Sequence, residues 1–180
     1  MPTSYDPLAL ESQICFALAV ASRGVISAYR SVLEPIHLTH PQYLVMLALW
    51  QHETLPVRKI AELLRLEAAT VSPLIKRLEA LGYVEKRRGS HDERVVEVSL
   101  TVAGAKLRGT AEAIPGQMMA KLDMGEAELR ELHSMMTRLI EAVDASQAVE
   151  VSHTSHAVEA SNAIDPSKTV DVESSGADST

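Results

Sequence analysis

Apolar residues recur at three- and four-residue steps through most of the first 82 residues, and this period predicts amphipathic helices. Asp6 followed by Pro7 is a favourable N-cap and first position for the earliest helix. Gly82 suits the end of the last one, because glycine commonly closes a helix in the left-handed conformation. The four expected helices run from Asp6 to about Leu33, from His40 to Trp50, from Leu55 to Leu64 and from Glu67 to Gly82.

The second and fourth of these helices are the most informative. Residues 43–50 are apolar almost all round, which indicates a buried helix. Pro73 lies within the fourth helix and cannot donate a backbone hydrogen bond, so we expect this helix to bend early or to begin later. Its expected inward positions are Val71, Ile75, Leu78 and Leu81.

The period changes to two after Gly82, which predicts strands. Residues 83–88 and 94–100 flank a polar segment and together predict a β-hairpin. Two more helices are expected, from Thr101 to about Met119 with a disturbance near Pro115, and from about Gly125 to Ala145. The first and last helices are too apolar for a lone small domain, so we expect an obligate homodimer that buries the surplus.

Short helices followed by a basic hairpin predict a mainly α fold with a small β-hairpin, the winged helix-turn-helix arrangement. We expect residues 1–145 to form this domain, with 36–101 as the DNA-binding helices and wing. Residues 1–35 and 102–145 would supply the dimerisation helices. Residues 146–180 have no sustained period and are rich in Ser, Ala, Val, Asp and Glu, so we expect an acidic, flexible tail there.

The mean charge hides an uneven distribution along the chain. The 180 residues include 17 basic and 24 acidic side chains, and the resulting formal charge of −7 by itself argues against a nucleic-acid partner. The tail from Ser146, however, holds six acidic residues and one lysine, whereas residues 55–110 hold eleven basic and seven acidic residues. A basic middle and an acidic end are compatible with DNA binding.

Composition also excludes several classes of protein and site. The single cysteine, Cys15, excludes an internal disulfide and a cysteine-based zinc site. No apolar run approaches the roughly 20 residues of a membrane span, and the first residues lack the pattern of a signal peptide. We therefore expect a soluble cytoplasmic protein that has no membrane partner, is not an enzyme, and requires no metal or cofactor.

The fourth helix is the expected DNA-reading helix, which enters a major groove while the wing follows the backbone or a minor groove. Arginine on the wing is attracted to narrow A·T-rich minor grooves. Each of these residues taken singly could equally be a solvated charge, but their ordered combination favours DNA binding. The candidate contacts are Thr70, Ser72, Lys76 and Arg77 on the helix and Lys86, Arg87, Arg88 and Arg94 on the wing.

Two groups of motifs resemble a known family. Residues 63–82, 92–94 and 100–104 are similar to the MarR family of dimeric repressors. Residues 13–18, 21–23, 29–30 and 38–50 are similar to its organic-hydroperoxide-sensing branch, called OhrR. The resemblance covers about residues 8–144 and leaves the tail unmatched. It implies a homodimer that binds a pseudo-palindromic operator in double-stranded DNA, and it adds Asp92 to the DNA-binding residues.

The resemblance to OhrR implies that Cys15 senses organic hydroperoxides. At the start of a helix the dipole favours a thiolate, which attacks the O–O bond and becomes a sulfenic acid. In the family, tyrosines hydrogen-bond to this cysteine across the dimer interface and are displaced on oxidation, after which the DNA-reading heads no longer fit their half-sites. Tyr29 occupies one tyrosine position, but His40 occupies the other.

His40 and Cys15 each allow two interpretations. His40 can replace the tyrosine as a partner of Cys15, where its cation would favour the thiolate, or it can merely cap the second helix. Cys15 can be the sensor or a buried, inert cysteine. Because the chain has no second cysteine, a sulfenic Cys15 would be captured by a small external thiol, a backbone nitrogen or another subunit, or be over-oxidised.

Two other functions stay open on the sequence alone. A MarR-like repressor could release DNA on binding a small lipophilic or aromatic ligand between its DNA-binding and dimer regions, with Cys15 incidental. The same thiolate chemistry could instead turn over in a thiol peroxidase. Against the peroxidase, the sequence carries the pattern of a DNA-reading head and lacks a resolving cysteine.

Overall fold

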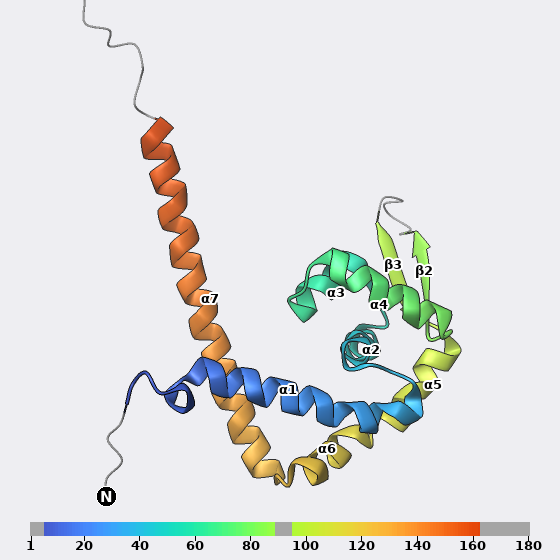
Figure 1. The fold of residues 1–180 in the computed structure, drawn as a ribbon. Coiled ribbons are helices and arrows are strands. Elements are labelled where there is room, and N and C mark those ends of the chain that lie inside the picture. Colours follow the sequence, from blue (N-terminus) through green and yellow to red (C-terminus); the bar gives the residue numbers. More distant parts are fainter. Residues whose placement is uncertain (1–5, 89–94, 163–180) are drawn as a thin grey trace, which may run out of the picture. The chain divides into compact units, whose positions relative to one another are not determined.

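The computed structural model describes residues 6–88 and 95–162, with side chains up to residue 148, and divides into one unit that ends at Glu126 and a second that begins at Ala127 (Figure 1). The second unit is formed by helix α7 (Glu126–Asn162). The expected mainly α fold with a small hairpin, the winged helix-turn-helix, is confirmed. The first unit contains α1 (Ile14–Leu33), α2 (His40–His52), β1 (Thr54–Pro56), α3 (Val57–Leu64), α4 (Ala68–Ala80), β2 (Val84–Arg88), β3 (Val96–Leu100), α5 (Val102–Ala111) and α6 (Ile114–Leu122), with short 3-10 helices at Leu10–Ser12 and Glu34–Ile36.

Helix α2 forms the centre of the core, as its apolar sequence predicts. Val45, Met46 and Leu49 are completely buried. They belong to one cluster with buried residues of α3, α4 and the sheet, so these helices and the expected wing share a single core. The fully buried members contributed by those elements are Ile60, Val71, Leu78, Val84 and Val98.

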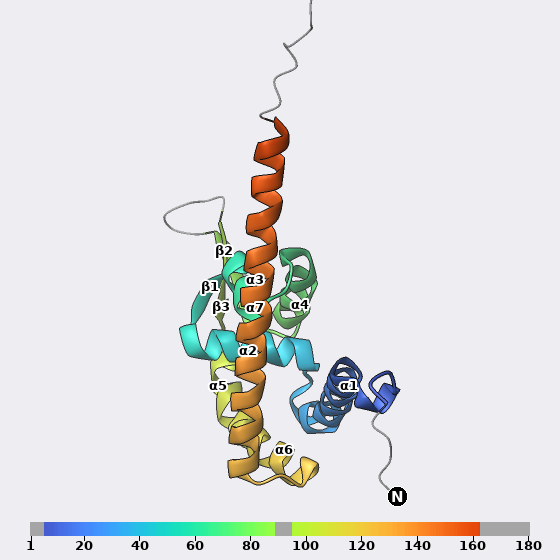
Figure 2. The ribbon, with the colours of Figure 1, turned by 90° about the vertical axis from the view of Figure 1, so that its left-hand side faces the viewer.

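The wing is part of a three-stranded antiparallel sheet in the order β1-β3-β2, and Figure 2 shows these strands together beside α3. In the predicted hairpin, Val84 pairs with Leu100 and Arg88 pairs with Val96. Strand β1 was not predicted, because three residues between two helices are too few to display an alternation. Its Leu55 lies opposite Val98, and burial of both side chains ties the start of α3 to the sheet.

Helix α4 neither starts late nor stops at Pro73, which is its sixth residue. Proline there removes the bond that residue 73 would donate to the carbonyl of Ala69, and the buried face formed by Val71 and its neighbours retains the helix. Leu81 was expected to point inward but is 42% exposed, because it is already the C-cap. Gly82 follows with φ of 74°, as expected for a residue that closes a helix.

The first helix begins at Ile14 and not at Asp6. The Asp6 carboxylate accepts a hydrogen bond of 2.9 Å from the Leu8 N–H, which closes only a local turn. Gln13 then adopts an extended backbone and becomes the N-cap of α1. The correction places Cys15 closer to a helix start than the sequence suggested.

The last helices also differ from the expectation. The helix predicted from Thr101 to Met119 is two, since α5 ends at Ala111 and Pro115 lies in the first turn of α6, where a missing N–H costs nothing. Helix α7 continues past the predicted end at Ala145 as far as Asn162, because residues 146–162 contain neither glycine nor proline. The expected tail is therefore helical in its first part.

The exposed apolar surface of α1 corrects another expectation. Ile14–Ile36 is long and apolar enough to cross a membrane by length and composition, and only 6% of its most apolar window is buried. The expectation that no apolar run approaches this length was wrong. A helix whose apolar face pairs with another subunit meets the same two criteria.

Candidate functional site

Cys15 is exposed and is the second residue of α1. The side-chain amide of Gln13, the N-cap, donates to the carbonyl of Pro7 at 2.5 Å and fixes the turn that leads into the helix. Within one chain, Cys15 is therefore not a buried cysteine, while its role as a sensor stays a prediction. Its thiol is accessible to a small oxidant.

Tyr29 and His40 lie against each other where α1 meets α2, with their ring centroids 5.0 Å apart. The ring of Tyr43 continues the cluster, 5.9 Å from Tyr29 and 6.1 Å from Trp50. Burial raises the pKa of Tyr29, and burial together with the neighbouring Tyr29 raises the pKa of Tyr43. Both phenols therefore remain protonated hydrogen-bond donors at neutral pH.

His40 is not the cap of α2. Thr39 is the N-cap, and its N–H and its hydroxyl both donate to Oε1 of Gln42 at 2.8 Å. The imidazole is free of that role and lies beside a cavity of about 260 Å³, which Arg30 and Thr39 also line. The alternative that His40 merely caps the helix is wrong.

The protonation state of His40 also differs from the expectation. Burial lowers its pKa below the usual 6.5, so the neutral imidazole predominates at pH 7. A neutral imidazole can donate one hydrogen bond and accept another, whereas the expected cation can only donate.

Cys15 does not meet these aromatic residues within one chain. Tyr29 follows Cys15 by fourteen positions in the continuous helix α1, which places the two about 21 Å apart at 1.5 Å per residue. The structure thus brings Tyr29 and His40 together and leaves Cys15 at the other end of the same helix.

The predicted residues of the DNA-reading helix all lie on the outer face of α4. Thr70, Ser72, Lys76 and Arg77 are exposed. The Ser72 hydroxyl donates to the carbonyl of Ala68 at 2.8 Å, so that an oxygen lone pair stays available outside the helix. Among the described residues neither Lys76 nor Arg77 has an ion-pair partner within 4.0 Å, which leaves both charges available to phosphates or bases.

The basic side chains of the wing differ in their ion pairing. The Lys86 ammonium lies 2.8 Å from a Glu79 carboxylate oxygen, and the Arg87 guanidinium lies 2.7 Å from Glu85. Arg88 is exposed at the end of β2. The remaining predicted wing residues, Asp92 and Arg94, lie outside the described residues.

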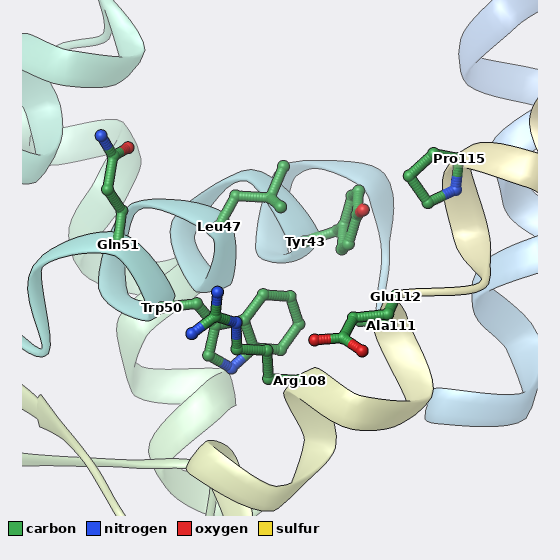
Figure 3. A pocket seen from close by; sticks show the side chains of 8 residues that line it. All are labelled: Tyr43, Leu47, Trp50, Gln51, Arg108, Ala111, Glu112 and Pro115. Carbon is green, nitrogen blue, oxygen red and sulfur yellow. The ribbon is translucent and has the colours of Figure 1, made fainter.

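A cavity of about 280 Å³ lies between α2, α5 and α6, in the region where the alternative of a small ligand would place it, although the sequence did not indicate its lining residues (Figure 3). Its wall is mainly apolar, with Arg108 and Glu112 as the charged groups. Residues 43–50 were expected to form a buried helix. In the structure Leu47 on this helix is 42% exposed, because one side of α2 faces the opening of the cavity. The lining residues are Tyr43, Leu47, Trp50, Gln51, Arg108, Ala111, Glu112 and Pro115.

Comparison with known proteins adds independent information. A family model described as transcriptional regulator SarA/Rot matches residues 27–109. The organic hydroperoxide resistance transcriptional regulator of Bacillus subtilis is 38% identical over 143 residues, which are 79% of this chain and 97% of that protein. The HTH-type transcriptional regulator TtmR of Methylorubrum extorquens is 44% identical over 138 residues, 74% of this chain and 71% of that protein.

A solved structure shows the same relationship in three dimensions. Reduced AbfR bound to DNA superimposes with a TM-score of 0.67 at 29% identity, and the match covers 76% of this chain and 93% of that chain.

Proposed function

Because the chain belongs to the MarR family of transcriptional regulators, in its organic-hydroperoxide-sensing branch OhrR, we propose that it is a homodimeric repressor that releases its operator when an organic hydroperoxide oxidises Cys15. The observation that carries this proposal is the exposed Cys15 in the first turn of α1. It is joined on the same chain to an α4 whose outer face is polar and basic.

The separation of Cys15 from Tyr29 and His40 supports a site shared between two subunits. The apolar side chains exposed along α1 need a cover, and a second copy of α1 running in the opposite direction supplies one. This pairing would bring Cys15 of one subunit to the cavity that His40 lines in the other. The exposed apolar residues near and along α1 include Leu10, Ile14, Phe16, Val20 and Ile26.

The oxidation requires only the thiolate and the peroxide. The Cys15 sulfur attacks one peroxide oxygen, the O–O bond breaks, and the products are a sulfenic acid and an alcohol once the alkoxide takes a proton. A small external thiol then displaces water from the sulfenic acid and leaves a mixed disulfide, because the chain has no second cysteine. Tyr29 and neutral His40 would hydrogen-bond to the reduced thiolate and lose that contact on oxidation.

DNA binding is assigned to the outer face of α4 and the wing. Lys76 and Arg77 would contact phosphates or guanine edges in the major groove, while Thr70 and Ser72 supply shorter hydrogen-bonding groups. Arg88 would act from the wing, together with Asp92 and Arg94. The dimer would read a pseudo-palindrome with half-sites about 10 base pairs apart, or a multiple of that. A role on DNA places the protein in the cytoplasm.

A band-shift assay on the palindrome upstream of its own gene tests this function. Wild type and Cys15→Ser are each incubated with operator DNA, with and without cumene hydroperoxide. Release of wild type alone supports the sensor, whereas equal release of both proteins contradicts it. Steady consumption of peroxide without DNA binding would instead identify a thiol peroxidase, although the relatives are transcriptional regulators.

The part played by His40 has its own test. His40→Phe keeps an aromatic ring beside Tyr29 but removes the hydrogen-bonding nitrogens. We expect the alkylation rate of Cys15 by iodoacetamide to change its pH dependence, because the thiolate loses a partner. An unchanged profile would remove His40 from the site and leave the rest of the proposal intact.

The cavity between α2, α5 and α6 favours one alternative, a repressor released by a small lipophilic or aromatic ligand. Its apolar wall and the Arg108 guanidinium suit an aromatic ring that bears an acidic group (Figure 3). Trp50 is the only tryptophan of the chain and lines this cavity, so its fluorescence reports occupancy directly. Release of Cys15→Ser from DNA by benzoate or salicylate at a concentration that quenches Trp50 would support this alternative.

A further inference from the structure

The first turn of α5 is bonded to three separate parts of the DNA-binding domain. The buried indole N–H of Trp50, on α2, donates to the carbonyl of Gly104 at 2.9 Å. Thr101, the N-cap of α5, donates from its hydroxyl to the Gly82 carbonyl at 2.6 Å and accepts from the Gly104 N–H at 3.1 Å. Gly82 directly follows the C-cap of the DNA-reading helix. We call Trp50, Gly82, Tyr83, Thr101 and Gly104 the α5 corner.

The backbone segments of the α5 corner are packed in direct contact. A Cβ added at Gly104 would lie 1.9 Å from the carbonyl oxygen of Tyr83, so the backbones of α5 and of the residue that precedes β2 are in direct contact. The Tyr83 carbonyl also accepts from the Thr101 N–H at 3.0 Å, and the Tyr83 N–H donates to Leu78 in α4 at 3.0 Å. The end of α4, the base of the wing and the start of α5 therefore form one rigid joint.

The same joint is connected to the candidate redox residues through ring contacts. Trp50 packs edge-on against Tyr43, Tyr43 contacts Tyr29, and Tyr29 contacts His40. Tyr43 and Trp50 both project from α2 toward α5 (Figure 3). Packed rings transmit a displacement because the interior resists compression. These contacts provide a packed route from Tyr29 and His40 to the α5 corner through α2.

We infer that Trp50 is a positioning residue whose indole N–H couples the state of the Tyr29 and His40 cluster to the orientation of α4 and the wing. The inference rests on the proposed function, in which oxidation of Cys15 removes contacts from those two residues. Because the N–H is buried, α2 cannot move away from α5 without leaving a donor unsatisfied. The two helices therefore move together, and Gly82 and Tyr83 move with them.

Trp50→Phe tests the coupling in the full-length protein. Phenylalanine keeps an apolar ring against Tyr43, although a smaller one, and removes the hydrogen bond to Gly104. Gln51→Ala is the matched control, because Gln51 is the next residue of α2 and is exposed. For each protein the operator Kd is measured by fluorescence anisotropy before and after cumene hydroperoxide, and mass spectrometry measures the fraction of Cys15 oxidised.

At equal oxidation of Cys15, we expect wild type and Gln51→Ala to lose about 5- to 150-fold in operator affinity, the usual range of coupling between two sites. Trp50→Phe should lose less than about threefold, while its reduced form binds within about threefold of wild type. An oxidised Trp50→Phe that loses as much affinity as wild type would overturn the inference.

Amide hydrogen exchange of the reduced proteins provides a second measurement that does not depend on peroxide. Trp50→Phe should exchange faster than Gln51→Ala at Tyr83, Thr101 and Gly104, with no difference in α1. Unchanged exchange at these three amides refutes the coupling, whatever the band shift shows. If wild type is not released by peroxide, the proposed function fails, and faster exchange at the α5 corner still supports the link between α2 and α5.

Discussion

Substitution of Gly104 by alanine is the most direct test of how α5 packs on the base of the wing. The new Cβ would lie 1.9 Å from the Tyr83 carbonyl oxygen and 2.9 Å from its carbonyl carbon, whereas ordinary contact begins at 3.4 Å. Backbone atoms must therefore separate by about 1.5 Å, the difference between 3.4 and 1.9 Å. Overpacking of this kind typically costs about 1–3 kcal/mol, and a contact with backbone belongs at the upper end.

Gly109→Ala is the matched control on the same helix. A Cβ at Gly109 meets nothing within 4 Å, so alanine there should stabilise α5 by about 0.5–1 kcal/mol through helix propensity. The two variants should differ by roughly 1.5–4 kcal/mol, the sum of the overpacking cost and this gain. For a unit of this size that corresponds to a difference in Tm of at least about 6 °C.

Far-ultraviolet circular dichroism measures both melting temperatures at one protein concentration, because dimerisation makes Tm depend on concentration. Urea unfolding followed by Trp50 fluorescence gives the same comparison if heating is irreversible. A Tm of Gly104→Ala within about 2 °C of the Tm of Gly109→Ala would correspond to a difference of less than about 1 kcal/mol in the free energy of unfolding. That result would refute the close approach of α5 to Tyr83.

Three further predictions concern capping, pH and DNA. Thr101→Val should lower the free energy of unfolding by about 1–2 kcal/mol in a urea titration, because it loses the N-cap and the bond to Gly82, whereas Thr101→Ser should stay near wild type. Burial lowers the pKa of His40, so below about pH 6.5 the unfolded state binds more protons than the folded state. The free energy of unfolding should therefore fall as the pH drops from 6.5 through the pKa of folded His40. This loss should vanish in His40→Phe if His40 is its source. Arg77→Ala should weaken operator binding and reduce the slope of log K against log salt by about one, and Lys121→Ala, whose ammonium is bonded to Ser31, should leave that slope unchanged.

The local elements follow from short-range patterns. Periods of three to four and of two locate the helices and the hairpin, and the position of Gly82 ends α4 as predicted. The predicted helix boundaries are wrong where the periodic pattern is weak or where the backbone conformation of one residue sets the boundary. Gln13 adopts an extended backbone and delays α1, and Pro115 begins a new helix instead of disturbing an old one.

Some features of the candidate site also follow from local patterns, whereas others depend on tertiary packing. The exposed positions of Thr70, Ser72, Lys76 and Arg77 follow from helical geometry alone, because outward positions alternate with the buried Val71, Ile75 and Leu78. The hypothesis that His40 is a partner of Cys15 stays a prediction. Its place beside Tyr29 agrees with the resemblance, but its protonation depends on burial, which no local pattern reports.

By itself the sequence determined that this chain is a helical protein with a basic hairpin and an exposed polar helix face next to it, and that one cysteine stands near the start of its first helix. Those properties reside in neighbouring residues and in composition. Only the tertiary structure decided that Cys15 and Tyr29 lie at opposite ends of one helix, that Trp50 bonds to Gly104 across 54 residues, and that Gly104 must lack a Cβ. Such contacts join residues distant in the chain, and they form only when the shared core brings α2, α5 and the sheet together.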